Sequence, residues 1–265
     1  MSEPLEPSSS TLSPPPSAFA SFWGAVLFYT VIPLPAFLPI ALTRISRWCP
    51  LVGLGLGGLL ALIDGGLAGC GFNPLLRGGL LVALGVALTG GLHLDGVSDT
   101  ADGLAVTDPA QRLTVMQDSR TGAYGVMAIA LVLLLKTLAL GELATLRSFA
   151  LPLAMGWGRW GQVTAIAFYP YLKAEGKGAK HRQEFCLPQD LLLGSLVLLL
   201  FSALWIYGMP QQGLLILGST LGSAAIAAGC SAWFAWRLGG HTGDSYGAVV
   251  EWSETLILCA LTAIF

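Results

Sequence analysis

Long apolar runs separated by short polar stretches dominate the chain after residue 20 and limit what it can fold into. Eight of them have roughly the 17 to 25 apolar residues that a helix needs to cross a bilayer core. They cover about 20–42, 51–70, 78–101, 123–143, 148–171, 190–208, 212–235 and 246–265. Because backbone groups in lipid must be bonded internally, and because these runs do not alternate as barrel strands do, they predict helices. The expected fold is an all-α, polytopic integral membrane helical bundle.

The number of transmembrane helices is left at six to eight, because 148–171 and 190–235 could contain a re-entrant or interfacial piece. The closely spaced Gly53, Gly55, Gly57 and Gly58 predict helices packed at short distance, since small residues let backbones approach in lipid. Residues 1–19 are rich in Pro and Ser and are predicted to form a disordered tail. Residues 20–265 then form a single transmembrane domain.

The charges are few and unevenly placed. Only 11% of the residues are charged, against about 25% in soluble proteins, and the mean hydropathy is +0.72. A net charge of −2 gives no reason to expect a nucleic-acid partner. Basic residues gather after the odd-numbered spans, which the positive-inside rule places in the cytoplasm. They are Arg44, Arg47, Arg112, Arg120, Lys173, Lys177, Lys180, Arg182 and Arg237, whereas only Arg77 and Arg147 follow the second and fourth spans.

Three aspartates stand at the end of the third apolar run, in GGLHLDGVSDTADGL. On a helix Asp99 lies about 40° from Asp95, and Asp102 about 20° to the other side, so all three share one face. Unpaired carboxylates this close would repel one another, and a divalent cation relieves that conflict. Hard oxygen ligands favour Mg²⁺ or Mn²⁺, and Mg²⁺ usually completes its shell with water and substrate phosphates. We therefore expect Mg²⁺ on Asp95, Asp99 and Asp102, and a diphosphate substrate.

Two further polar stretches fall on the same expected side of the membrane. MQDSRTGAYG supplies Asp118 and Arg120, which could form a local salt bridge or a phosphate clamp. GGHTGDSYGAVVEWSET supplies Asp244, Glu251 and Glu254, with Asp244 and Glu251 about 20° apart on a helix. Ionisable residues within membrane segments indicate function by default, although Glu251 and Glu254 could instead pair with Arg159 or Lys136.

These blocks carry a resemblance. GGLHLDGVSDTADGL, QDSRTGAYG and GGHTGDSYGAVVE, with FYTVIPLP and CPLVGLGLG before them, together resemble the cobalamin synthase family, the adenosylcobinamide-GDP ribazoletransferases. The similarity covers most of the chain after the tail. Two positions depart from the family pattern, with Leu94 where an acidic residue is expected and Tyr246 where leucine is usual.

The resemblance implies a phosphoryl transfer in cobalamin biosynthesis. A ribose hydroxyl of α-ribazole, or of its 5′-phosphate, would attack the cobinamide-side phosphorus of adenosylcobinamide-GDP and expel GMP. Mg²⁺ on the three aspartates would hold the diphosphate, and Arg120 would stabilise the leaving GMP. Asp118, Asp244 or Glu251 would complete the metal shell or accept the hydroxyl proton. The expected location is the plasma (inner) membrane, with the active site facing the cytoplasm.

Two other functions fit parts of the pattern. A CDP-alcohol phosphotransferase also places aspartates on a helical face, but its motif has an Ala-Arg pair where this chain has Val97, Ser98 and Asp99 after Gly96. A cation-coupled transporter would place its ionisable residues near the bilayer midplane, at broken helices. Most of the acidic residues here are expected at the cytoplasmic ends of the spans, which favours the enzyme.

Overall fold

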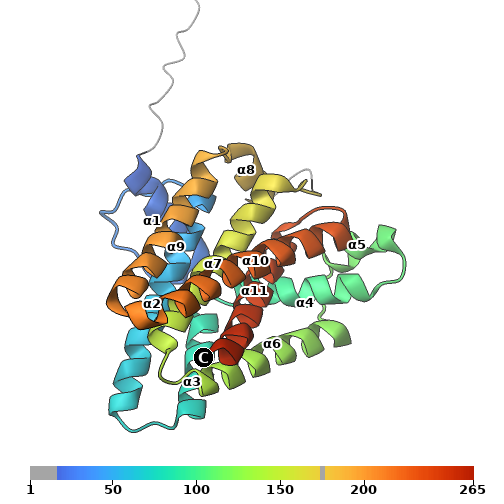
Figure 1. Cartoon of the computed structure of the whole chain (residues 1–265). Helices are drawn as coiled ribbons and strands as arrows, with labels where there is room; N and C mark the ends of the chain where they lie inside the picture. Colours follow the sequence, from blue (N-terminus) through green and yellow to red (C-terminus); the bar gives the residue numbers. More distant parts are fainter. Residues whose placement is uncertain (1–16, 174–176) are drawn as a thin grey trace, which may run out of the picture.

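The structure, a computed structural model, describes residues 17–173 and 177–265, and in these ranges it consists of helices joined by short loops (Figure 1). Residues 1–16 of the predicted tail lie outside the described residues, and the first helix begins at Ala18. The α-helices are α1 (Ala18–Tyr29), α2 (Cys49–Gly69), α3 (Pro74–Leu88), α4 (Leu92–Ala105), α5 (Arg112–Val115), α6 (Ala123–Glu142), α7 (Arg147–Phe168), α8 (Lys177–Glu184), α9 (Gln189–Gly208), α10 (Gly213–Leu238) and α11 (Gly243–Ile264). Three short 3-10 segments are η1 (Ile45–Trp48), η2 (Pro109–Gln111) and η3 (Pro210–Gln212).

Several of these helices are long and apolar enough to cross a membrane. Among the described residues there are five, Ile45–Gly69, Ala123–Glu142, Gln189–Gly208, Pro210–Leu238 and Gly243–Ile264. α3 and α4 pass the same test only when taken together, which raises the number to six. The predicted fold class, a polytopic helical membrane bundle, is confirmed, and the count reaches the lower end of the predicted range.

The first predicted span, 20–42, is helical only in its first half. α1 ends at Tyr29, and no helix is found from residue 30 to residue 44. Three prolines, Pro33, Pro35 and Pro39, follow one another there. Proline lacks the backbone N–H that a helix needs and keeps the preceding residue out of the α region. An apolar run of suitable length is therefore not a continuous helix here.

The third predicted span, 78–101, is two helices rather than one. α3 ends at Leu88, and Gly90 and Gly91 follow with φ of 62° and 71°, a left-handed conformation that favours glycine. α4 then leaves at 92° to α3. The three aspartates consequently lie on a helix of their own, which crosses the bundle instead of continuing α3 (Figure 1).

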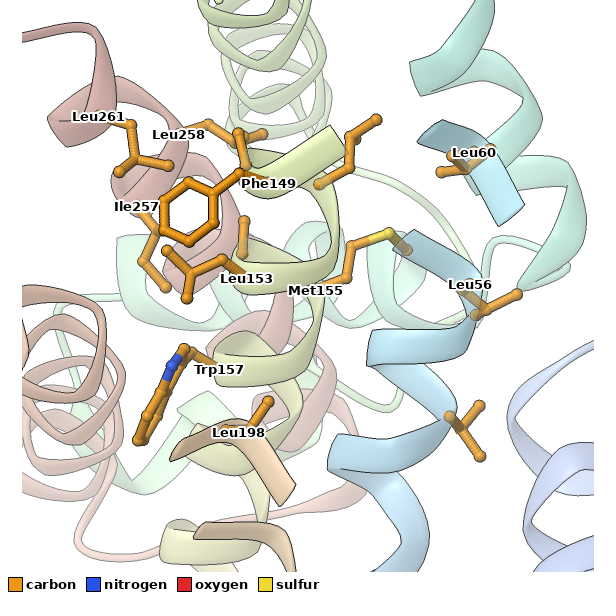
Figure 2. Packing of buried hydrophobic residues seen from close by; sticks show 14 of the residues in the cluster. Leu56, Leu60, Phe149, Leu153, Met155, Trp157, Leu198, Ile257, Leu258 and Leu261 are labelled. Atoms are coloured by element: carbon orange, nitrogen blue, oxygen red, sulfur yellow. The ribbon is translucent and has the colours of Figure 1, made fainter. Parts of the chain in front are cut away.

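Helix α7 forms the centre of the bundle, and nearly all of its residues are buried. It packs against α2, α10 and α11. Figure 2 shows Phe149 and Leu153 of α7 beside Ile257 and Leu258 of α11, while Met155 projects toward α2. α7 carries Arg147 and Arg159 and is not among the five apolar spans. A helix that is surrounded by other helices and not by lipid can carry such charged side chains.

Two of the four clustered glycines of α2 fulfil the packing prediction. A Cβ at Gly53 would collide with the backbone carbonyl of Met155, and one at Gly57 with the backbone of Leu151 and Pro152. By contrast, a Cβ at Gly55 or Gly58 would meet nothing within 4 Å. The close approach of α2 to α7 therefore depends on the glycines four residues apart, which share one helix face.

Candidate functional site

Helix α4 lies across the beginning of α11, and glycine makes that crossing possible. A Cβ at Gly96 would collide with the backbone carbonyl of Asp244, and one at Gly247 would come 3.0 Å from Cα of His93. The two backbones thus touch directly at this point. The contact brings Asp244, in the first turn of α11, next to the aspartates of α4.

The acidic face is the side of α4 that carries Asp95, Asp99 and Asp102, and on it Asp95 and Asp99 remain available to a ligand. Asp95 is exposed and Asp99 is half-buried, one turn further along α4. Asp99 lies within electrostatic reach of the carboxylates of Asp95, Asp244 and Asp102, and of the ammonium of Lys173. Three negative charges thus surround a fourth, with one cation partly offsetting them.

Lys173 reaches this group from the segment after α7. Leu172 N donates to His241 O at 2.8 Å, and His241 N donates to Pro170 O at 2.8 Å. These bonds hold the segment beside the α10–α11 turn. Lys173 Nζ then lies 3.1 Å from Asp244 Oδ2. Sequence analysis counted Lys173 among the positive-inside charges and did not pair it with Asp244, because its partner is 71 residues away and no periodicity connects the two.

Asp102 turns to a neighbouring helix instead. Its two carboxylate oxygens accept hydrogen bonds from the backbone N–H groups of Gly122 at 2.7 Å and Gly125 at 2.9 Å. These groups stand at the beginning of α6, where backbone donors have no partner within the helix. Asp102 thus caps α6 from a distance, with one hydrogen bond to each of its carboxylate oxygens.

Asp118 and Arg120 form a salt bridge at the surface. Arg120 donates from Nη2 to Asp118 Oδ2 at 2.7 Å, and also from Nε. Hydrogen bonds from Arg120 lower the pKa of Asp118 to about 2. The side chain of Arg120 is 88% exposed. The pair borders a shallow depression shared with Asp102 and Gly122, so a ligand in this depression would lie beside Arg120.

Glu251 lies deeper in the bundle than the aspartates. Lys136 Nζ is 2.6 Å from Glu251 Oε2 and 2.7 Å from Glu254 Oε2, and Arg159 pairs with Glu254 at 2.7 Å. All four side chains are buried. Seven residues of helix, about 10 Å along the axis, separate Glu251 from Asp244. The structure thus gives Glu251 a cationic partner away from the acidic face.

A cavity of about 290 Å³ opens beside the acidic face. Asp95, Lys173 and Asp244 line it together with the rings of His93, His181 and Tyr246. A larger pocket of about 600 Å³ lies around the opposite side of α4, lined by Val97, Ala101 and aromatic residues of α10 and α11. Because that lining is almost entirely apolar, it offers no groups for diphosphate chemistry. The smaller cavity is the better candidate for a catalytic site.

The donor set can be compared with what Mg²⁺ requires. In the part of the chain that the structure describes, no three His, Cys, Asp or Glu side chains are gathered closely enough to hold a metal. Two carboxylates, Asp95 and Asp99, stand one turn apart, and among the described residues neither forms a salt bridge. Mg²⁺ is commonly held by one or two carboxylates and completed by substrate phosphates. The residues present therefore fit a cation shared with a diphosphate, rather than a preformed three-aspartate cage.

Fold and site together define an integral membrane protein with an acidic, lysine-bearing cavity at the crossing of two helices. The model of the cobalamin-5-phosphate synthase family matches residues 21–262, and the chain belongs to this family. Curated relatives named adenosylcobinamide-GDP ribazoletransferase include one from Synechocystis sp., 54% identical over 92% of this chain and 95% of the relative. Others come from Trichormus variabilis, 51% identical over 91% and 95%, and Prochlorococcus marinus, 37% identical over 94% and 97%. No solved structure matches the chain.

Proposed function

We propose that the chain is an adenosylcobinamide-GDP ribazoletransferase of cobalamin biosynthesis, whose site lies at the crossing of α4 and α11. It joins adenosylcobinamide-GDP to α-ribazole, or to its 5′-phosphate, and releases GMP. Family membership and the names of the relatives support the reaction. The observation that carries the site is the convergence of Asp95, Asp244 and Lys173 on one cavity. These observations favour this function over those of a CDP-alcohol phosphotransferase and a cation-coupled transporter.

The reaction forms one oxygen–phosphorus bond and breaks another. The ribose hydroxyl attacks the cobinamide-side phosphorus, and the bridging oxygen leaves with GMP. Asp244 is best placed to accept the hydroxyl proton, because it lines the cavity and is about one-quarter exposed. Asp118 is bound to Arg120 and has a lowered pKa, and Glu251 is bound to Lys136. Asp244 is likewise paired, with Lys173, but of these three carboxylates it is the one that lines the cavity.

Charge neutralisation is divided among several groups. Lys173 Nζ lies 3.1 Å from Asp244 Oδ2. It would exchange this partner for an entering phosphate, because a flexible ammonium is a common phosphate ligand. Asp95 and Asp99 would hold Mg²⁺, which when bound neutralises the diphosphate and orients it for in-line attack. Arg120 borders the depression beside Asp102 and not the cavity itself, and it would reach the leaving phosphate from that depression. Asp102 acts chiefly by positioning α6.

The catalytic domain is proposed to comprise residues 20–265, in the plasma membrane with its site toward the cytoplasm. The accessible basic residues support this orientation, because Arg120 is exposed, Lys173 and Arg44 are about one-quarter exposed, and all three belong to the positively charged set. Arg77 and Arg147 of the sparse set are buried and bind Asp64 instead. The asymmetry in exposed positive charge is therefore stronger than the sequence count indicates.

The test uses the purified full chain in lipid nanodiscs with adenosylcobinamide-GDP, α-ribazole and Mg²⁺. We expect cobalamin and GMP in equal amounts, and loss of both on adding EDTA. Asp95→Asn should lower turnover by about 100-fold or more, because one electrostatic contact to the transition state is lost. Asp108→Asn is the matched control, since Asp108 is exposed and only caps η2. Near-normal turnover of Asp95→Asn would show that the site is wrongly placed.

A further inference from the structure

The cavity beside the acidic face becomes more enclosed away from its charged residues. Lys173 and Asp244 have side chains that are 25% and 27% exposed. The other lining side chains include His93, His181 and Tyr246, which are only 3%, 6% and 2% exposed. Charged groups thus lie at the mouth, and aromatic rings with polar atoms lie in the interior.

The interior polar atoms lack partners. Both ring nitrogens of His93, both of His181 and the hydroxyl of Tyr246 are buried without a hydrogen bond among the described residues. Leaving such groups unpaired costs free energy, and most buried polar groups in proteins are paired. The remaining histidine, His241, shows the usual pattern, because Nδ1 lies 3.0 Å from Ser245 Oγ and Nε2 lies 3.2 Å from Ser231 O.

These unpaired groups offer both donors and acceptors. Burial lowers the pKa of His181 to about 4, so its ring is neutral near pH 7 and presents one N–H donor and one acceptor nitrogen. A tyrosine hydroxyl can do both. A ligand that satisfies these groups must therefore carry several donors and acceptors of its own.

Aromatic rings form much of the interior lining. The ring of Phe28 meets that of His181 edge to face at 5.0 Å between centroids, and the ring of Tyr29 stacks on it at 6.3 Å. Tyr171 and Tyr246 lie 5.8 Å apart on another part of the lining. A volume of about 290 Å³ is at the lower limit of ligand pockets, about 300 Å³, which suits one nucleoside but not a corrin ring.

We infer that this cavity binds the guanine base of the GDP group, with the diphosphate directed to Asp95 and Lys173 at the mouth. Guanine presents two donor groups, N1–H and the 2-amino group, and three acceptors, O6, N7 and N3, which can pair with the histidine and tyrosine groups. The dimethylbenzimidazole of α-ribazole has one free ring nitrogen and two methyl groups, so it would leave most of them unpaired. This inference rests on the proposed function, since it assigns one part of the GDP-bearing substrate.

The test measures binding of guanosine alone to the full chain in nanodiscs, in EDTA, so that neither metal nor catalysis is needed. Wild type should bind guanosine about tenfold more tightly than inosine, which lacks the 2-amino group. Tyr246→Phe keeps the ring and removes the hydroxyl, and His181→Phe keeps an aromatic ring and removes both nitrogens. Each should weaken guanosine binding by about tenfold. Tyr207→Phe is the control, because Tyr207 is 88% exposed on α9.

Steady-state kinetics separate the possible outcomes. The inference requires the KM for adenosylcobinamide-GDP to rise in both variants, with kcat and the KM for α-ribazole little changed. A rise confined to the KM for α-ribazole would place the acceptor in this cavity and overturn the guanine assignment. Unchanged guanosine affinity in both variants would overturn it too. A wild type that binds guanosine but makes no cobalamin would refute the proposed function and not the guanosine pocket.

Discussion

Lys136 lies inside the helical bundle and binds two carboxylates at once, those of Glu251 and Glu254. Arg159 is the second cation of this buried group, and a Cβ at Gly158 would come within 2.6 Å of the side chain of Glu254. Removing one partner of a buried ion pair leaves an uncompensated charge, which is strongly destabilising. At the scale of single residues, Glu251 thus has a structural partner that accounts for its burial.

Replacing this lysine tests that interpretation. Lys136→Met leaves two neighbouring carboxylates with one cation, so the free energy of unfolding should fall by about 3–5 kcal/mol. Thermal denaturation in detergent micelles would measure the loss. Lys180→Met should have almost no effect, because Lys180 is exposed and 3.8 Å from Glu184. Equal stability of the two variants would contradict the structural role.

At the scale of elements, the crossing of α4 and α11 decides whether the site exists. Gly96 has no room for a side chain against the backbone of Asp244. The same crossing places Asp244 and Asp95 on one cavity. Neither helix alone carries the site, and their contact does not depend on a charged pair between them.

A larger residue at this crossing should separate the two helices. Gly96→Val forces the backbone of α11 away from α4, and displacements of about 1 Å can cost about 100-fold in rate. We expect turnover to fall to that extent while the chain is still inserted in the membrane. Gly58→Ala on α2 is the control, since nothing lies within 4 Å of its Cβ. Retained activity in Gly96→Val would show that the crossing does not position the reacting groups.

At the scale of the whole molecule, two native cysteines report the orientation. Cys70 follows α2 and Cys186 follows α8, and both are exposed. The α2–α3 connection and α8 lie at opposite ends of the molecule (Figure 1). A site that faces the cytoplasm requires Cys186 to be inside the cell and Cys70 outside.

Labelling of intact cells with a membrane-impermeant maleimide tests this orientation. Cys70 should react and Cys186 should be protected until the cells are opened, because the exposed basic residues hold the α8 side in the cytoplasm. Cys70→Ser and Cys186→Ser identify which residue carries the label. The reverse pattern would place the proposed site outside the cell.

Local periodicity predicted the helical architecture and part of the site. Six of the eight apolar runs coincide with α2, α6, α7, α9, α10 and α11. Local sequence also accounts for the start of η2, where Asp108 precedes Pro109 and Asp108 Oδ1 accepts from Ala110 N at 3.0 Å. Length and hydropathy could not show the bend at Gly90–Gly91, because two left-handed glycines hardly change either quantity.

Sequence by itself determined the membrane-embedded helical class, the family and the acidic face, because each depends on residues within a few turns of one another or on whole-chain similarity. Only the tertiary structure decided what each carboxylate does. Asp102 bonds to groups 20 and 23 residues away, Asp244 to a lysine 71 away, and Glu251 to a lysine 115 away. The partners of a charge are set by which helices touch, and helix contacts follow from packing across the whole bundle.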